Sequence, residues 1–191
     1  MRRLIKNFAA FISAKNEYTR DLEEQLEYSL RITVFETLKI FGIIFFFSIF
    51  GHSVEAAVAV GTMAIIKPFI GGYHEDTQVG CFAAALVIVA CVIYLSINLN
   101  IDLISKLILS GVSLYCIWNQ APVINPKMTL TKVDLIMRNR KVGLLLTALF
   151  IIISIVTYRY NSVSNSILWT IVIQALLMFN KRSLDITKKC E

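Results

Sequence analysis

The chain has 191 residues, 57% of them hydrophobic, and a mean hydropathy of +0.68. A soluble domain of this length could not bury so much apolar side-chain surface, so the composition excludes a soluble protein and predicts an integral membrane protein. The formal net charge of +6 does not indicate a nucleic-acid partner, because the basic residues flank apolar segments and form no nucleic-acid-binding motif.

Residues 1–31 are predicted to form an amphipathic segment on the membrane surface. Apolar residues recur there at helical spacing, at Leu4, Phe8, Phe11 and Ile12 and again at Leu22, Leu26 and Leu30. Charged residues interrupt any signal-peptide core, so we expect the mature protein to keep the segment. Its second half is acidic, so the segment either binds a basic or amphipathic partner or serves only as an anchor.

Six apolar segments follow, each near the roughly 20 residues that a spanning helix needs. They are residues 32–50, 54–70, 81–97, 99–118, 142–158 and 163–179. The second segment is short and is predicted to be broken by Pro68, to be tilted or partly re-entrant, and to end before Gly71 and Gly72. The predicted fold is therefore an all-α, polytopic membrane protein. We expect one membrane domain over residues 1–191, with a transmembrane region over 32–179 and a tail over 180–191.

The lysines and arginines that flank these segments set the predicted orientation. Nearly all of them fall on the side of the membrane that holds both termini, and only Arg159 falls on the other side. The positive-inside rule therefore predicts cytoplasmic termini and a cytoplasmic location for the polar interruption at residues 71–80. Cysteine thiols stay reduced in the cytoplasm.

Two pairs of opposite charges lie within or near the predicted spans. Lys39 follows Glu36 by three residues, and Lys106 follows Asp102 by four. Each pair could neutralise itself along one helix face, or the charges could line a polar cavity beside a reactive cysteine.

His74 and Cys81 are the candidate catalytic pair, because a nucleophilic thiol needs a nearby base or positive charge. Residues seven apart on one straight helix stand about 10.5 Å apart along its axis, so the chain must turn, and the neighbouring glycines permit a turn. We expect Cys81 to open a spanning helix, whose first-turn amides favour a thiolate and an oxyanion. Glu75, Asp76 and Gln78 remain alternatives for a third, orienting group.

The other cysteines within apolar segments, Cys91 and Cys116, are interpreted as small packing residues. The cysteine spacing indicates neither a disulfide nor a metal site. His52, the second histidine of the chain, is expected on the opposite membrane face from His74, so a metal hydrolase is not favoured and no cofactor is expected.

The stretch Lys67-Pro68-Phe69-Ile70-Gly71-Gly72-Tyr73-His74, followed by Cys81, resembles the AgrB (accessory gene regulator protein B) family. Residues 121–127 and the basic run Arg138-Asn139-Arg140-Lys141 resemble the central loop of that family. With the length and the predicted topology, the resemblance extends over nearly the whole chain.

The resemblance implies a cysteine endopeptidase of the bacterial plasma membrane that acts in quorum sensing. Such an enzyme removes the C-terminal tail of a precursor peptide and promotes its cyclisation to an autoinducing peptide. The family's catalytic pair maps onto His74 and Cys81, and its basic residue and glycines map onto Lys67, Gly71 and Gly72. The expected partners are the precursor peptide, the lipid bilayer and a second copy of the chain.

Two alternatives stay open at the level of the sequence. Arg138, Arg140 and Lys141 either attract an acidic substrate tail or only hold their loop in the cytoplasm. A non-enzymatic peptide exporter or membrane scaffold is the rival function, although no nucleotide-binding motif supports active export.

Overall fold

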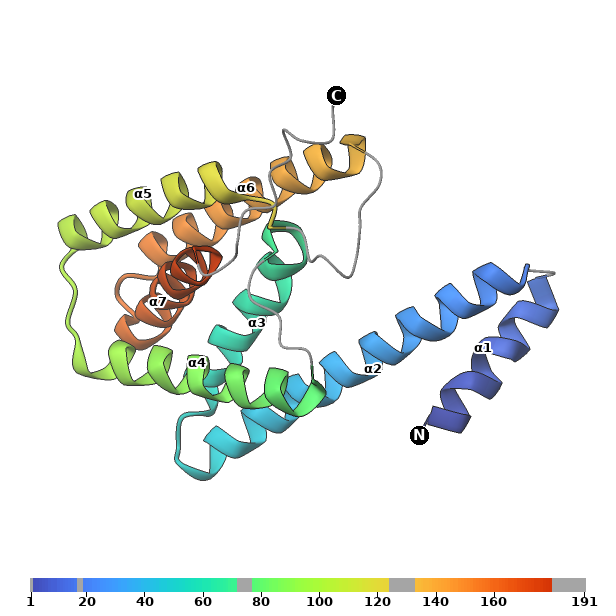
Figure 1. Ribbon diagram of the computed structural model, residues 1–191. Helices are drawn as coiled ribbons and strands as arrows, with labels where there is room; N and C mark the ends of the chain where they lie inside the picture. Colours follow the sequence, from blue (N-terminus) through green and yellow to red (C-terminus); the bar gives the residue numbers. More distant parts are fainter. Residues whose placement is uncertain (1, 17–18, 72–76, 124–132, 180–191) are drawn as a thin grey trace.

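A computed structural model describes residues 2–16, 19–71, 77–123 and 133–179. Every named element within these ranges is an α-helix, which confirms the all-α prediction (Figure 1). The helices are α1 (Arg2–Asn16), α2 (Arg20–Ile49), α3 (Ser53–Ile70), α4 (Gln78–Asn98), α5 (Leu103–Gln120), α6 (Val133–Val156) and α7 (Asn161–Met178).

Among the described helices, five are long and apolar enough to cross a membrane: α2, α3, α4, α6 and α7. The fourth predicted segment, residues 99–118, forms α5, whose mean hydropathy is reduced by a buried polar face with Lys106, Ser110 and Ser113. Large apolar side chains point outward all along the helices, as with Phe45 at 71% and Leu145 at 70% exposure. Such surfaces are stable in lipid but not in water, so the chain is an α-helical membrane protein.

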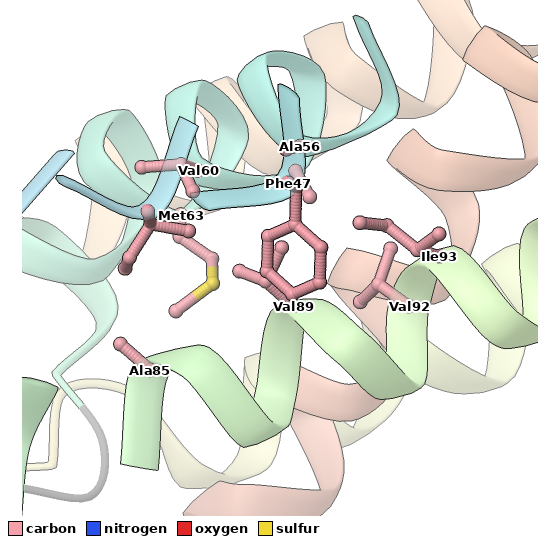
Figure 2. Packing of buried hydrophobic residues seen from close by; sticks show 10 residues of the cluster. Phe47, Ala56, Val60, Met63, Ala85, Val89, Val92 and Ile93 are labelled. Carbon is pink, nitrogen blue, oxygen red and sulfur yellow. The ribbon is translucent and has the colours of Figure 1, made fainter. Parts of the chain in front are cut away.

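Helix α7 forms the centre of the bundle and packs against α3, α4, α5 and α6 (Figure 1). Ten of its residues are buried. One core cluster joins α2, α3 and α4, where Phe47 lies close to Ala56 and Val89 (Figure 2). A second cluster joins α3, α5 and α7, with side chains of α6 packed against it.

The N-terminal region differs from the prediction of one surface segment over residues 1–31. Helix α1 ends at Asn16, and α2 begins at Arg20 and continues without a break to Ile49. Leu22, Leu26 and Leu30 therefore belong to the same helix as the first span. Helix α1 packs alongside the first half of α2, and both project from the bundle (Figure 1).

Helix α3 ends before the paired glycines, as predicted, but it is not broken at Pro68. Pro68 lies in the last turn, and only two residues of the helix follow it. The loss of its backbone N–H donor therefore affects only the end of α3. The amide of Gly71 donates to the carbonyl of Lys67 at 2.9 Å and closes the helix. The interpretation of Cys116 as a packing residue is confirmed, whereas that of Cys91 is wrong because Cys91 faces outward.

The predicted ion pair between Asp102 and Lys106 is also wrong, because it is not among the ion pairs of the described residues. Asp102 instead caps α5 and accepts hydrogen bonds from the amides of Ile104 and Ser105 at 3.1 and 3.2 Å. Lys106 is fully buried and donates to the hydroxyl of Ser164 on α7. Because the carboxylate of Asp102 accepts hydrogen bonds from the first amides of its own helix, it does not pair with Lys106 one turn later.

Candidate functional site

Cys81 lies in the first turn of α4, half-buried, as the sequence predicted. Thr77 is the N-cap of this helix, and its hydroxyl accepts a hydrogen bond from the amide of Gly80 at 3.1 Å. The amide of Cys81 donates to the carbonyl of Thr77 at 3.0 Å. The amides of Gly80 and Cys81 are therefore occupied, and any oxyanion donor in this turn comes from the residues before them.

Lys39 of α2 makes the contact that distinguishes this cysteine. Its Nζ donates to Sγ of Cys81 at 3.6 Å. The same Nζ lies 2.5 Å from Oε2 of Glu36, one turn earlier on α2. The pairing of Glu36 with Lys39 is thus confirmed, and the ion pair also lies beside the candidate nucleophile. The sequence offered only one sign of this contact, namely two charges inside an apolar segment.

A small pocket of about 180 Å³ lies where α1, α2 and α4 meet. It is lined by Ile5, Arg31, Phe35 and Gln78. Arg31 and Phe35 precede Lys39 by eight and four residues, so all three share one face of α2. Arg31 donates to Glu27 at 2.9 Å, while its Nε is buried without a hydrogen-bond partner in the described part of the chain.

Two of the predicted site residues, Gly72 and His74, lie outside the described residues, as do Glu75 and Asp76. The approach of His74 to Cys81 therefore stays a prediction. Lys67 lies half-buried in the last turn of α3. Gly71 follows it with a φ of 76°, a left-handed conformation that favours glycine.

Gly71 has a structural reason for lacking a side chain. It pairs with Val123 beyond the end of α5, and the amide of Val123 donates to the carbonyl of Ile70 at 2.9 Å. A Cβ on Gly71 would stand 2.1 Å from the carbonyl oxygen of Val123. The close approach of the two backbones thus connects the segment before the His74 motif with the end of α5.

The basic run is helical rather than part of a loop, because α6 begins at Val133. Arg138 and Lys141 are exposed. Arg140 instead donates from Nη2 to the carbonyl of Trp118 at 2.9 Å, which connects α6 to the last turn of α5. Of the three basic residues predicted to attract a substrate tail, only Arg138 and Lys141 are therefore exposed without a described hydrogen bond.

The described residues contain no group of three or more histidine, cysteine or acidic side chains that could hold a metal ion. Within the described residues, the site consists of the thiol of Cys81 in the first turn of α4 and the ammonium group of Lys39 in contact with it. A thiol in such a setting has the features of a nucleophile rather than of a packing residue.

Comparison with known proteins identifies the family. The profile of the Accessory gene regulator B family matches residues 5–178. An AgrB-like protein of Clostridium perfringens (strain 13 / Type A) is 35% identical over 181 residues, which cover 95% of this chain and 97% of the relative. The chain belongs to the AgrB family. No solved structure matches it.

Membership in the AgrB family assigns the chain to the accessory gene regulator system and agrees with the quorum-sensing role that the motif predicted. The matched range includes all six helices from α2 to α7 and most of α1. In this AgrB chain, Lys67 lies in the last turn of α3 and Cys81 in the first turn of α4.

Proposed function

We propose that this AgrB-family protein is a membrane-embedded cysteine endopeptidase. It cleaves the C-terminal tail from a quorum-sensing precursor peptide and promotes cyclisation of the remainder to an autoinducing peptide. The observation that carries the proposal is the thiol of Cys81 in the first turn of α4, with the Nζ of Lys39 at 3.6 Å. A positive neighbour at a helix start is the environment of reactive cysteines.

The proposed reaction starts with transfer of the thiol proton of Cys81 to His74. The sulfur then attacks a backbone carbonyl of the precursor and forms a carbon–sulfur bond. The carbon–nitrogen bond of the scissile peptide breaks, and the tail leaves as an amine that takes a proton from the imidazolium of His74. An acyl-enzyme thioester remains on Cys81.

Ring closure requires that a nucleophile of the same precursor reaches the thioester before water does. A cysteine thiol of the precursor would exchange one thioester for another at little change in free energy, and Cys81 would leave as a thiol. Holding that nucleophile beside the acyl carbon makes the step effectively unimolecular. A site at the membrane boundary, as proposed for Cys81, can limit the access of water.

The substrate is proposed to approach along the inner leaflet of the bacterial plasma membrane, with both termini of the enzyme in the cytoplasm. Its acidic tail would be attracted by the exposed Arg138 and Lys141. The outward-facing Phe8 and Phe11 of α1, at 55% and 66% exposure, offer apolar surface to lipid or to an amphipathic precursor helix. We expect the enzyme to act as a homodimer.

The decisive experiment follows precursor cleavage in vesicles that contain the purified protein. Cys81→Ala should abolish cleavage while the protein still inserts, because the nucleophile is lost. Cys91→Ala and Cys116→Ala are matched controls, since one thiol faces outward and the other packs in a core cluster, and both should retain cleavage. Cleavage that persists in Cys81→Ala would refute the proposal and favour an exporter or scaffold.

A further inference from the structure

We propose that Lys39 is a catalytic residue of this site, whose ammonium group holds the sulfur of Cys81 as a thiolate. The inference rests on the proposed function of Cys81 as the nucleophile. The contact joins α2 to α4 across 42 positions of sequence, so it is a product of the tertiary fold and not of local spacing.

The depth of Lys39 in the membrane is the first argument. Ten residues of α2 follow it up to Ile49, a length of about 15 Å, whereas the hydrocarbon core is about 30 Å thick. The helix is apolar enough to cross the bilayer over Leu22–Ile49, so Lys39 lies inside the span. A lysine at such a depth is costly unless it faces a partner, and intramembrane charges commonly serve a function.

The direction of the side chain is the second argument. The side chain of Lys39 is 16% exposed, but that of its partner Glu36 is 52% exposed. If the lysine served only to neutralise Glu36, it could extend outward with it. Its Nζ instead reaches Sγ of Cys81 on the neighbouring helix while it stays in contact with the carboxylate.

The chemistry of the contact is the third argument. An ammonium group has three N–H donors and no acceptor, so it can donate to the carboxylate and to the sulfur at the same time. Its positive charge stabilises a thiolate more than a neutral thiol, and a surrounding of low dielectric strengthens this preference. The negative charge of Glu36 opposes the effect, because the carboxylate is bound to the same ammonium group.

Few other described charges surround the sulfur. Helices α2, α3 and α7 pack against α4. Helix α7 carries no ionisable side chain, and α3 carries Glu55 in its first turn and Lys67 in its last. Glu55 accepts a hydrogen bond from Ser162 at the start of α7. On α2, Arg31 lies two turns before Lys39 and pairs with Glu27.

In the proposed reaction, Lys39 keeps its protons throughout. The thiol proton passes to His74, and the thiolate remains paired with the ammonium until it attacks the substrate carbonyl. Formation of the thioester then removes the negative charge from the sulfur. The proton on His74 passes to the departing amine, so charge and atoms balance without any change in Lys39.

The test measures the reactivity of Cys81 directly, without a substrate. A chain with Cys81 as its sole cysteine, made by replacing Cys91, Cys116 and Cys190 with serine, is placed in lipid nanodiscs. The rate of alkylation by iodoacetamide is then recorded between pH 5 and pH 10. A free thiol is only a few per cent thiolate at pH 7, so Lys39→Met should alkylate about tenfold more slowly at that pH and reach its half-maximal rate at higher pH.

Two further variants separate a charge effect from a structural one. Glu36→Gln keeps a hydrogen-bond acceptor but removes the opposing negative charge, so alkylation at pH 7 should be at least as fast as in the parent chain. Lys39→Arg keeps the charge and should stay within about threefold of the parent rate. Lys106→Met removes another buried lysine, which donates to Ser164, and should leave the profile unchanged.

The inference is overturned if Lys39→Met keeps the parent profile, or if Glu36→Gln slows alkylation at pH 7 about tenfold. The second outcome would indicate disturbed packing, and it remains measurable even if Lys39→Met fails to insert. Failure of the proposed function is a separate result, because it is read from precursor cleavage by Cys81→Ala. Loss of cleavage in Cys81→Ala with an unchanged alkylation profile in Lys39→Met would refute the role of Lys39 alone.

Discussion

Gly42 of α2 lies against the ring of Phe82 on α4, and a Cβ built on Gly42 would stand 3.4 Å from Cε2 of that ring. Gly42 follows Lys39 by three residues, and Phe82 follows Cys81 directly. The glycine therefore permits α2 and α4 to approach next to the contact between the ammonium and the sulfur. A methyl group fits at this distance as an ordinary van der Waals contact, whereas further side-chain atoms directed at the ring would displace it.

The size of residue 42 should accordingly control the reactivity of Cys81. We expect Gly42→Ala to cleave the precursor at close to the parent rate. Gly42→Leu should overpack the contact with Phe82, at a cost of about 1–3 kcal/mol in stability, and move Lys39 away from the sulfur. Precursor cleavage and alkylation of Cys81 should then both fall about tenfold. Unchanged rates in an inserted Gly42→Leu protein would contradict this account of the helix separation.

The apolar runs of the sequence predicted the helices but not the starts of α2 and α6. Hydropathy marks only the part of a helix that lies in lipid, and the helix can extend beyond it on polar residues. For this reason α2 begins at Arg20 rather than near residue 32, and α6 begins at Val133 rather than near residue 142. The predicted ends of the helices agreed better with the structure. The end of α3, for example, is marked in the sequence by Gly71, whose backbone conformation favours glycine.

The part of the site that depends only on neighbouring residues could be predicted from the sequence. Cys81 lies in a first helical turn because Thr77 caps that turn, and both features can be read from neighbouring residues. The contact with Lys39 was not predictable, because it depends on how α2 packs against α4. Charge spacing identified the pair of Glu36 and Lys39 but failed for Asp102, since spacing does not show that a carboxylate caps its own helix.

Gly71 should tolerate no side chain. Gly71→Ala would strain a backbone with a φ of 76° and would place Cβ 2.1 Å from the carbonyl oxygen of Val123. We expect this variant to melt several degrees lower in detergent and to lose precursor cleavage. Gly111→Ala is the matched control, because nothing lies within 4 Å of its Cβ position and alanine favours a helix interior. A normal melting temperature for Gly71→Ala would contradict the close backbone approach to Val123.

The three basic residues of α6 should divide into two classes. Arg138→Gln and Lys141→Gln each remove an exposed charge, so they should raise the KM for an acidic-tailed precursor two- to fivefold, an effect that fades as salt screens it. Arg140→Gln should instead lower thermal stability by about 0.5–1.5 kcal/mol, because it removes the hydrogen bond to the carbonyl of Trp118. Kinetics at two salt concentrations, with melting curves for each variant, distinguish the classes. A KM that does not depend on Arg138 and Lys141 would leave them a topological role only.

The cap of α5 should make stability depend on acid. The hydroxyl of Ser105, followed by backbone amides of the same turn, lowers the pKa of Asp102 below its usual 3.8. A lowered pKa stabilises the fold above the unfolded value and loses that contribution as the pH falls through the folded value. The melting temperature of Asp102→Ala should therefore lie below that of the parent at pH 6, and the difference should shrink between about pH 4 and pH 2. Asp102→Asn caps without charge and should lack this change.

Lys106 should be dispensable for folding. Its side chain is fully buried, and the described residues offer it the hydroxyl of Ser164 and the ring of Tyr158, whose centroid lies 5.2 Å from Nζ. An ammonium group without a carboxylate keeps much of its desolvation penalty. The hydroxyl of Ser164 stays satisfied without the lysine, because it donates to the carbonyl of Ser154 at 2.5 Å.

Lys106→Met, which removes the ammonium group and keeps an unbranched apolar side chain, should therefore melt at the parent temperature or above it. Lys106→Glu should lower the stability by about 3–5 kcal/mol, because a buried carboxylate would lie near the hydroxyl of Ser164 and the face of the Tyr158 ring without a cation. Thermal unfolding in one detergent, at one protein concentration, compares the two. A lower melting temperature for Lys106→Met would show that the ammonium itself stabilises the junction of α5, α6 and α7, and that this buried charge is held by more than Ser164 and Tyr158.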